Sequence, residues 1–253
     1  MIVEDFLCLF FAQKAFVAVR GFSQSVLKKF NFYLGVSAFA NRWGVSNAMF
    51  LNFSVDARDL NYDPSEGWIA RQKLTWHGLI PKAEKEFYLR SDTKLEGYLK
   101  LLDLPVTDDW ALKLVLSGYT GLSMMFPIVP DVMGTEHQLS IDGMFNGRGW
   151  NYGVGGSGNV LWSSNVELRM PLMPGMVGVD FFFDAVAIKD KVENLSKLNI
   201  EDFYFSYGPG IRFLMPQFPL HLIFAWRFKV EDGAAKFAEN PFQFVLSFNI
   251  PNR

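Results

Sequence analysis

Apolar and polar residues alternate one by one along most of the chain from Phe30 onwards. This period of two is typical of β-strands, whose successive side chains point to opposite faces. The stretch 86–101 is the most informative, because a helix would scatter its charges around the circumference whereas a strand collects them on one face. That face carries Glu86, Tyr88, Arg90, Asp92, Lys94, Glu96, Tyr98 and Lys100, and the other carries Phe87, Leu89, Ser91, Thr93, Leu95, Leu99 and Leu101.

The same alternation predicts about ten strands, separated by turns rich in Pro, Gly, Asn and Asp. Residues 1–29 are poorly defined by the pattern, with one candidate strand over 15–19. Residues 126–158 lack periodicity and form a long loop. The predicted strands cover residues 32–41, 49–56, 68–77, 86–101 and 110–119 before this loop, and 160–170, 179–185, 203–213, 220–229 and 242–250 after it.

Two architectures fit alternating strands. A soluble β-sandwich buries the apolar face, whereas a transmembrane barrel turns it towards lipid and keeps the polar face in the lumen. Strands of about nine to eleven residues, the length that spans a bilayer, favour the barrel over globular strands of about five or six. The apolar faces are rich in Phe, Leu and Trp, and the polar faces mix both signs of charge, as a mutually paired lumen wall would. We therefore predict an all-β, antiparallel transmembrane β-barrel with about 10–12 strands in this chain.

Composition agrees with this prediction and narrows the function. Half of the residues are hydrophobic and 26 are Phe, while the net charge of −2 gives no indication of nucleic acid. No apolar run is long enough for a transmembrane helix. The single Cys8 excludes an internal disulfide, the histidines at 77, 137 and 221 lack metal-ligand spacing, and there is no Gly-x-Ser-x-Gly turn. We expect no enzyme activity, no cofactor and no metal.

The long loop carries the motif Gly147-Arg148-Gly149-Trp150. Loops of this length are uncommon and tend to be functional. The glycines allow a sharp turn with positive φ, and arginine offers a planar fork of donors suited to a carboxylate. From the residues alone, Arg148 is either an exposed loop-tip arginine or one half of a buried ion pair.

Several motifs, in their order and spacing, resemble the C-terminal barrel half of the bacterial outer-membrane β-barrel assembly proteins (BamA-like, the bacterial surface antigen family). The resemblance covers roughly residue 48 to the C-terminus. The loop motif resembles that family's V-R-G-F/Y, with Gly147 where valine is usual. The other matching segments are the D-x-R-D turn Asp56-Ala57-Arg58-Asp59, the strand Asn165–Arg169, the F-x-D element Phe182-Phe183-Asp184, the segment Ser206–Arg212 and the aromatic last strand.

The resemblance implies specific roles for these residues. Residues 1–253 would be the C-terminal portion of a sixteen-stranded barrel, preceded in the family by periplasmic POTRA domains whose αβ pattern is absent here. Arg148 would pair with Asp184 inside the barrel, helped by Phe182, and so pin the loop. The last strand would close against the first and open laterally to offer client strands an edge. Its outward residues are Phe242, Phe244, Leu246, Phe248 and Ile250.

The implied function is assembly and insertion of β-barrel proteins into the bacterial outer membrane. The implied partners are outer-membrane lipids, unfolded outer-membrane clients and, through upstream POTRA domains, periplasmic accessory lipoproteins; no nucleic acid is expected. The first alternative is a pore or transporter of the same superfamily, of the two-partner secretion type. A barrel lipase with a reactive serine and a soluble β-sandwich are the others.

Overall fold

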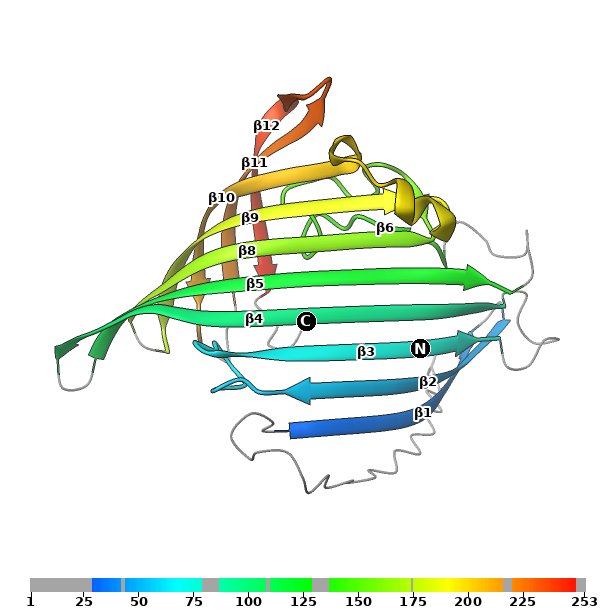
Figure 1. The fold of residues 1–253 in the computed structure, drawn as a ribbon, viewed down its shortest axis with the longest axis horizontal. Helices are drawn as coiled ribbons and strands as arrows, with labels where there is room; N and C mark the ends of the chain where they lie inside the picture. Colours follow the sequence, from blue (N-terminus) through cyan, green and yellow to red (C-terminus); the bar gives the residue numbers. More distant parts are fainter. Residues whose placement is uncertain are drawn as a thin grey trace, which may run out of the picture.

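The computed structural model describes residues 29–41, 44–78, 87–107, 110–128, 137–173, 175–215 and 220–248, with side chains from Ala48 onwards except at 107 and 110. One antiparallel sheet of ten strands dominates it, in the order β1-β2-β3-β4-β5-β8-β9-β10-β11-β12. Figure 1 shows this sheet curving like part of a cylinder wall. The strands are β1 (Lys29–Asn41), β2 (Gly44–Asp56), β3 (Gly67–His77), β4 (Tyr88–Thr107), β5 (Trp110–Pro127), β8 (Val160–Met173), β9 (Val177–Lys189), β10 (Phe203–Phe213), β11 (Leu220–Glu231) and β12 (Ala234–Phe248).

The remaining described elements are short. Strands β6 (Leu139–Ser140) and β7 (Ser157–Gly158) form a separate two-stranded ladder in the long loop. Two 3₁₀ helices, η2 (Val192–Lys197) and η3 (Ile200–Asp202), connect β9 to β10. Within the described residues, no helix has the length and apolar character needed to cross a membrane.

Several strands are longer than the alternation predicted. β4 and β5 have 20 and 18 residues, and their far ends project beyond the neighbouring strands (Figure 1). A register shift between Lys100 and Leu102 coincides with the predicted end of β4, and a second follows between Pro105 and Thr107, which accounts for the extra length of β4. An irregularity of this kind interrupts the period of two, so the sequence pattern ends where the strand continues. The extension of β5 from 120 to 127 pairs regularly with β4 and lies away from both shifts.

The predicted last strand 242–250 was wrong at its start. β12 begins at Ala234, eight residues earlier, and its pairing with β11 shifts between Trp226 and Phe228. This shift again breaks the alternation that the prediction relied on. Ile250 and the candidate strand over 15–19 lie outside the described residues.

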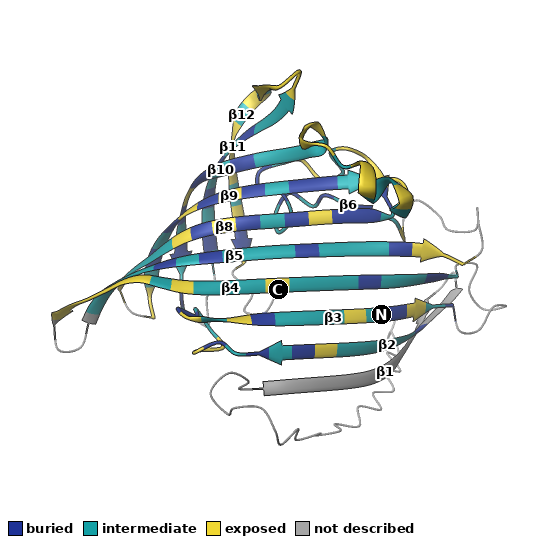
Figure 2. Cartoon of the chain, in the orientation of Figure 1, coloured by how far each residue is buried: buried dark blue, intermediate teal, exposed yellow. Residues whose placement is uncertain are grey.

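Burial along the strands is the reverse of that in a soluble sandwich. On β9, Phe181 and Phe183 are 52% and 42% exposed, whereas the alternating Asp180 and Asp184 are 4% and 3% exposed. Figure 2 shows the same alternation of buried and exposed positions on neighbouring strands. An apolar outer face around a polar inner face is the arrangement of a transmembrane barrel wall. Other exposed apolar residues are Trp76, Leu95, Leu99, Val166, Leu168, Phe242, Phe244, Leu246 and Phe248.

The charged face of β4 is paired with its neighbours, as a lumen wall requires. Arg90 Nε lies 2.9 Å from Asp92 Oδ2 within the strand. Glu96 Oε1 lies 3.7 Å from Arg71 NH1 on β3. The predicted interpretation of this row as a mutually paired wall therefore agrees with its contacts.

The β2–β3 turn, residues 57–66, reaches across the concave side of the sheet. Asp59 accepts hydrogen bonds from the Ser65 amide and hydroxyl at 3.0 and 2.5 Å, which orders the turn. At its tip, Asp63 Oδ1 accepts a hydrogen bond from Arg212 NH1 on β10 at 3.0 Å. In the sheet, β3 and β10 are separated by β4, β5, β8 and β9. The contact therefore joins two distant parts of the sheet across its concave side.

We predict that Phe183→Arg destabilises the barrel by about 2–4 kcal/mol, because Phe183 is the central outward residue of β9 and a cation there would face the bilayer midplane. Urea unfolding in lipid vesicles would measure the loss. Glu193→Arg, at an exposed position of η2 between β9 and β10, is the control and should change stability little. Equal effects of the two substitutions would contradict the lipid-facing assignment.

We predict that the β2–β3 turn loosens in acid. Burial alone would raise the pKa of Asp59, but hydrogen bonds from Ser65 and from nearby backbone amides lower that pKa below its ordinary value of 3.8. A lowered carboxyl pKa gives stability that is present above the ordinary pKa and is lost as pH falls through the folded one.

Hydrogen exchange at the Ser65 amide, corrected for its intrinsic pH dependence, should show protection at about pH 7 that is lost near about pH 2. In Asp59→Asn this response to pH should disappear. Equal protection of the native turn at both pH values would refute the role of the carboxylate.

Candidate functional site

The long loop between β5 and β8 folds onto the concave side of the sheet (Figure 1). It was predicted over 126–158, and the structure has it between Pro127 and Val160, described from His137 onwards. Its two ends are joined, because Leu139 and Ser140 of β6 pair with Gly158 and Ser157 of β7. The segment between them forms a compact tip.

Asp142 organises this tip from within. Its Oδ1 accepts hydrogen bonds from the amides of Met144, Phe145 and Asn146 at 2.8, 2.6 and 2.9 Å. One carboxylate oxygen thus satisfies three successive backbone donors, which holds the turn that leads into the motif.

The two glycines that flank Arg148 are required by backbone conformation and by space. Gly147 and Gly149 have φ of 66° and 88°, in the left-handed region that other residues rarely adopt. A Cβ on Gly147 would lie 2.5 Å from Val186 Cγ1, and one on Gly149 would lie 2.5 Å from the Ala225 Cβ. The loop backbone therefore presses against the wall on both sides of the arginine.

Arg148 is fully buried and bound by two carboxylates. Its backbone N and Nε donate to Asp184 Oδ2 at 3.1 and 2.8 Å, and NH2 donates to Asp184 Oδ1. NH1 donates to Glu167 Oε1 at 2.7 Å. The guanidinium also lies over the ring of Phe182, 4.0 Å from its centroid. Such a planar fork serves two carboxylates and a ring at once, which a lysine cannot do.

Strand register explains why these groups converge. Asn165, Asp184 and Ser206 form one row across β8, β9 and β10. In the next row, Glu167 is paired with Phe182. The two carboxylates thus lie on adjacent strands in adjacent rows, with Phe182 beside both, and a single guanidinium can reach all three side chains.

The ion pairs continue along the wall beyond Arg148. Arg169 donates to the second oxygen of Glu167 at 2.7 Å and lies 5.5 Å from the ring centroid of Tyr98. Charges therefore alternate from Asp184 through Arg148 and Glu167 to Arg169. Alternation of this kind compensates each buried charge, which would otherwise be costly in a confined lumen.

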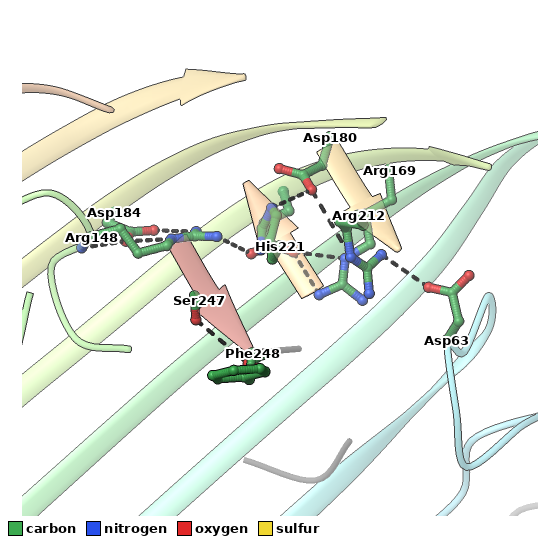
Figure 3. Close-up of polar contacts among 10 residues, drawn as sticks. Asp63, Arg148, Arg169, Asp180, Asp184, Arg212, His221, Ser247 and Phe248 are labelled. Carbon is green, nitrogen blue, oxygen red and sulfur yellow. Dashed lines mark hydrogen bonds and ion pairs between the residues drawn. The ribbon is translucent and has the colours of Figure 1, made fainter. Parts of the chain in front are cut away.

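A second chain of contacts lies one row further along the strands. His221 Nε2 on β11 is 2.9 Å from Asp180 Oδ2, and Arg212 Nε is 4.0 Å from the same oxygen. Gly210 leaves room for this contact, because a Cβ there would lie 2.4 Å from His221 Nε2. Figure 3 shows the polar contacts extending from Asp184 to Asp63 on the β2–β3 turn.

Trp150 completes the attachment of the loop. Its Nε1 donates to the Phe205 carbonyl on β10 at 3.1 Å, and its ring meets Tyr204 edge-on at 5.1 Å between centroids. Around it, the loop and the wall form a small apolar core inside the curve. The buried members of this core are Tyr88, Met125, Leu139, Ile141, Leu161 and Val186.

The structure brings most of the predicted site residues together. Arg148, Asp184 and Phe182 are in direct contact. The outward residues of the last strand, Phe242, Phe244, Leu246 and Phe248, are exposed on β12 and form a separate surface.

Sequence reasoning missed Glu167 as the second carboxylate on Arg148. The period of two predicts that Glu167 and Arg169 lie on the same polar face of their strand. The pattern therefore predicted the direction of the Glu167 side chain but not its contact with Arg148. It also missed the contacts of Asp180 with His221 and of Arg212 with Asp63, because these join segments far apart in the chain. Within the described residues, no group of three or more His, Cys, Asp or Glu is arranged to hold a metal ion.

Comparison with known proteins gives relatives that share this architecture. The chain is 38% identical over 243 aligned positions to a protein named "Putative outer membrane protein assembly factor" from Treponema pallidum (strain Nichols), covering 83% of this chain and 28% of the relative. The crystal structure of BamA from Haemophilus ducreyi lacking POTRA domains 1–3 matches with a TM-score of 0.61 at 18% identity, covering 87% of this chain and 51% of that chain. The chain thus spans only part of each relative's length.

The family comparison covers nearly the whole sequence. Residues 15–250 match the model of the Omp85 superfamily domain. The likeness to the BamA structure shows the same fold for the curved antiparallel sheet. The chain therefore belongs to the Omp85 superfamily, and its strands form part of an outer-membrane β-barrel of that family.

Proposed function

We propose that this protein assembles and inserts β-barrel proteins into the bacterial outer membrane. Membership of the Omp85 superfamily and the name of the Treponema relative, an outer membrane protein assembly factor, support this role. The structural observation that carries the proposal is the edge of β12. Among the described strands, β12 pairs with β11 alone, so its other edge presents backbone donors and acceptors to a further strand.

The edge of β12 suits the addition of a client strand inside the membrane. Phe242, Phe244, Leu246 and Phe248 point outwards, while Ser247 is 1% exposed on the inner side. An extended client segment would gain main-chain hydrogen bonds from this edge and an apolar environment for alternate side chains. An open edge is ordinarily an aggregation hazard; here lateral opening of the seam would make it the point of entry.

The contacts of Arg148 with Asp184, Glu167 and Phe182, which we call the loop lock, support the wall beside this edge. The ring of Phe182 lies under the Arg148 guanidinium. Phe182 also packs with Ile223 and Ala225 of β11 and with Val245 of β12. We therefore propose that Arg148, Asp184 and Glu167 hold β8 and β9 as a rigid support while β12 exchanges partners. The role requires no catalytic step and no cofactor. Its partners are outer-membrane lipids and unfolded outer-membrane clients, with periplasmic accessory lipoproteins acting through upstream domains.

We predict that a photo-crosslinking amino acid at Leu246 captures several unfolded outer-membrane proteins in growing cells, because Leu246 flanks the free edge. The same amino acid at Val166 on β8, equally outward but within the paired wall, is the matched control and should capture none. Mass spectrometry of the adducts would identify the captured proteins. Capture of a single secreted protein at Leu246 would favour the two-partner secretion transporter, and equal capture at both positions would exclude a client site at the edge.

We predict that Arg148→Ala frees the loop and destabilises the barrel by about 3–5 kcal/mol, because two buried carboxylates would lose their shared cation. Limited proteolysis of the loop and the temperature of the heat-dependent gel shift would measure both effects. Arg148→Lys should show an intermediate loss, since one ammonium cannot bridge Asp184 and Glu167 in the same way.

Arg90→Ala is the matched control for this loss. Its ion pair with Asp92 is partly exposed, so the expected change is below about 1 kcal/mol. Loop protection that is unchanged in Arg148→Ala would disprove the lock.

A further inference from the structure

A cavity of about 520 Å³ lies on the inner side of the wall, under the β2–β3 turn. This volume is within the range of small-molecule pockets, about 300–1,000 Å³. The turn forms one side, and residues of β4, β5, β8, β9 and β10 near one end of the sheet, together with Gly175 and Leu214, form the rest. Most of the lining is apolar, including Leu60, Pro64, Pro105, Ala111, Val115 and Leu214.

The charged groups of the lining are predominantly positive. Lys113, Arg169 and Arg212 face a single carboxylate, Asp63. Arg169 is already bound by Glu167, and Arg212 by Asp63. Lys113 forms no ion pair within the described part of the chain, so one cation in an apolar cavity is available to an anion.

A second polar group in this cavity lacks a partner. The Tyr62 hydroxyl is buried and makes no hydrogen bond within the described residues. A buried hydroxyl of this kind is costly unless a polar group meets it. Tyr62 adjoins Asp63 in the β2–β3 turn. Asp63 binds Arg212, so a carboxylate of the chain itself already neutralises one of the cations that line the cavity.

The lining also limits the kind of ligand. Three of its residues are prolines, Pro64, Pro105 and Pro171, and proline has no backbone N–H to offer a peptide chain. Within the described residues, the lining combines one unpaired cation with mostly apolar side chains, which suits a small molecule with one charged end.

We propose that this cavity binds a small amphipathic monocarboxylate, with its apolar body among the aliphatic and proline side chains and its carboxylate on Lys113, on the side of the cavity lined by the β2–β3 turn. This site is separate from the client edge at β12 and does not depend on the assembly role. Its test is a binding measurement, so failure of one proposal leaves the other intact.

Octanoate titrated calorimetrically into the full-length protein in lipid nanodiscs tests the site, with empty nanodiscs as the blank. We expect one saturable site, absent for 1-octanol because the alcohol has no charge for Lys113. Lys113→Gln should weaken binding by at least about tenfold. Ala111→Trp should abolish it by filling the cavity.

Ala70→Trp is the matched control, because Ala70 lies on the outer face of β3 between Trp68 and Trp76, and it should bind octanoate like the native protein. A heat-dependent gel shift verifies that each variant is folded; if Ala111→Trp does not fold, Lys113→Gln decides. Unchanged binding in the pocket variants, equal binding of 1-octanol, or saturable binding of a short peptide carboxylate without any binding of octanoate would overturn the proposal.

Discussion

The rest of the structure depends on how the charge of Arg148 is compensated. A fully buried guanidinium would be costly alone, and here Asp184 and Glu167 bind it while Phe182 lies against its face. These partners come from two adjacent strands, so the ion pairs join the loop tip to β8 and β9. Phe182 extends the attachment to β11 and β12 through Ile223, Ala225 and Val245. One charged side chain thus connects the long loop with the wall that ends in the free edge.

Lipid imposes the second constraint. The outer faces must be apolar, so polar and charged residues accumulate on the inner faces, where they have to be paired. The wall meets this requirement with a row of alternating charge from Asp184 to Arg169, and with Arg212 placed between Asp180 and Asp63. Where the long loop packs against the wall, the contacts are apolar and form a small core around Ile141 and Val186. Around Arg148 and the loop, the interior is therefore packed and its charges are paired, whereas the cavity under the β2–β3 turn is open.

In the proposed role, β12 exchanges partners while the strands beside it keep their register. The contacts of Arg148 with Asp184 and Glu167 join the loop to two of those strands, β8 and β9. The cavity under the β2–β3 turn lies apart from this edge. Beside the cavity, Asp63 of the turn accepts a hydrogen bond from Arg212 of β10. The two proposals therefore concern different parts of the same curved sheet, the β12 edge and the cavity under the β2–β3 turn.

Alternation by itself determined the all-β class and the sorting of each strand's side chains onto an apolar and a polar face, with Asp184, Glu167 and Arg169 on the polar faces. These follow from local geometry, since a strand turns successive side chains to opposite faces. Strand length and the composition of the faces then indicated that the polar faces are the inner ones. The sequence also marked Arg148 through its flanking glycines, and family resemblance suggested Asp184 as its partner. The end of β4 and the start of β12 were not readable, because register shifts break the period of two. Only the tertiary structure decided that Glu167 shares Arg148, that Asp63 meets Arg212 and that Lys113 lines a cavity, because these contacts depend on curvature and register between segments far apart in the chain.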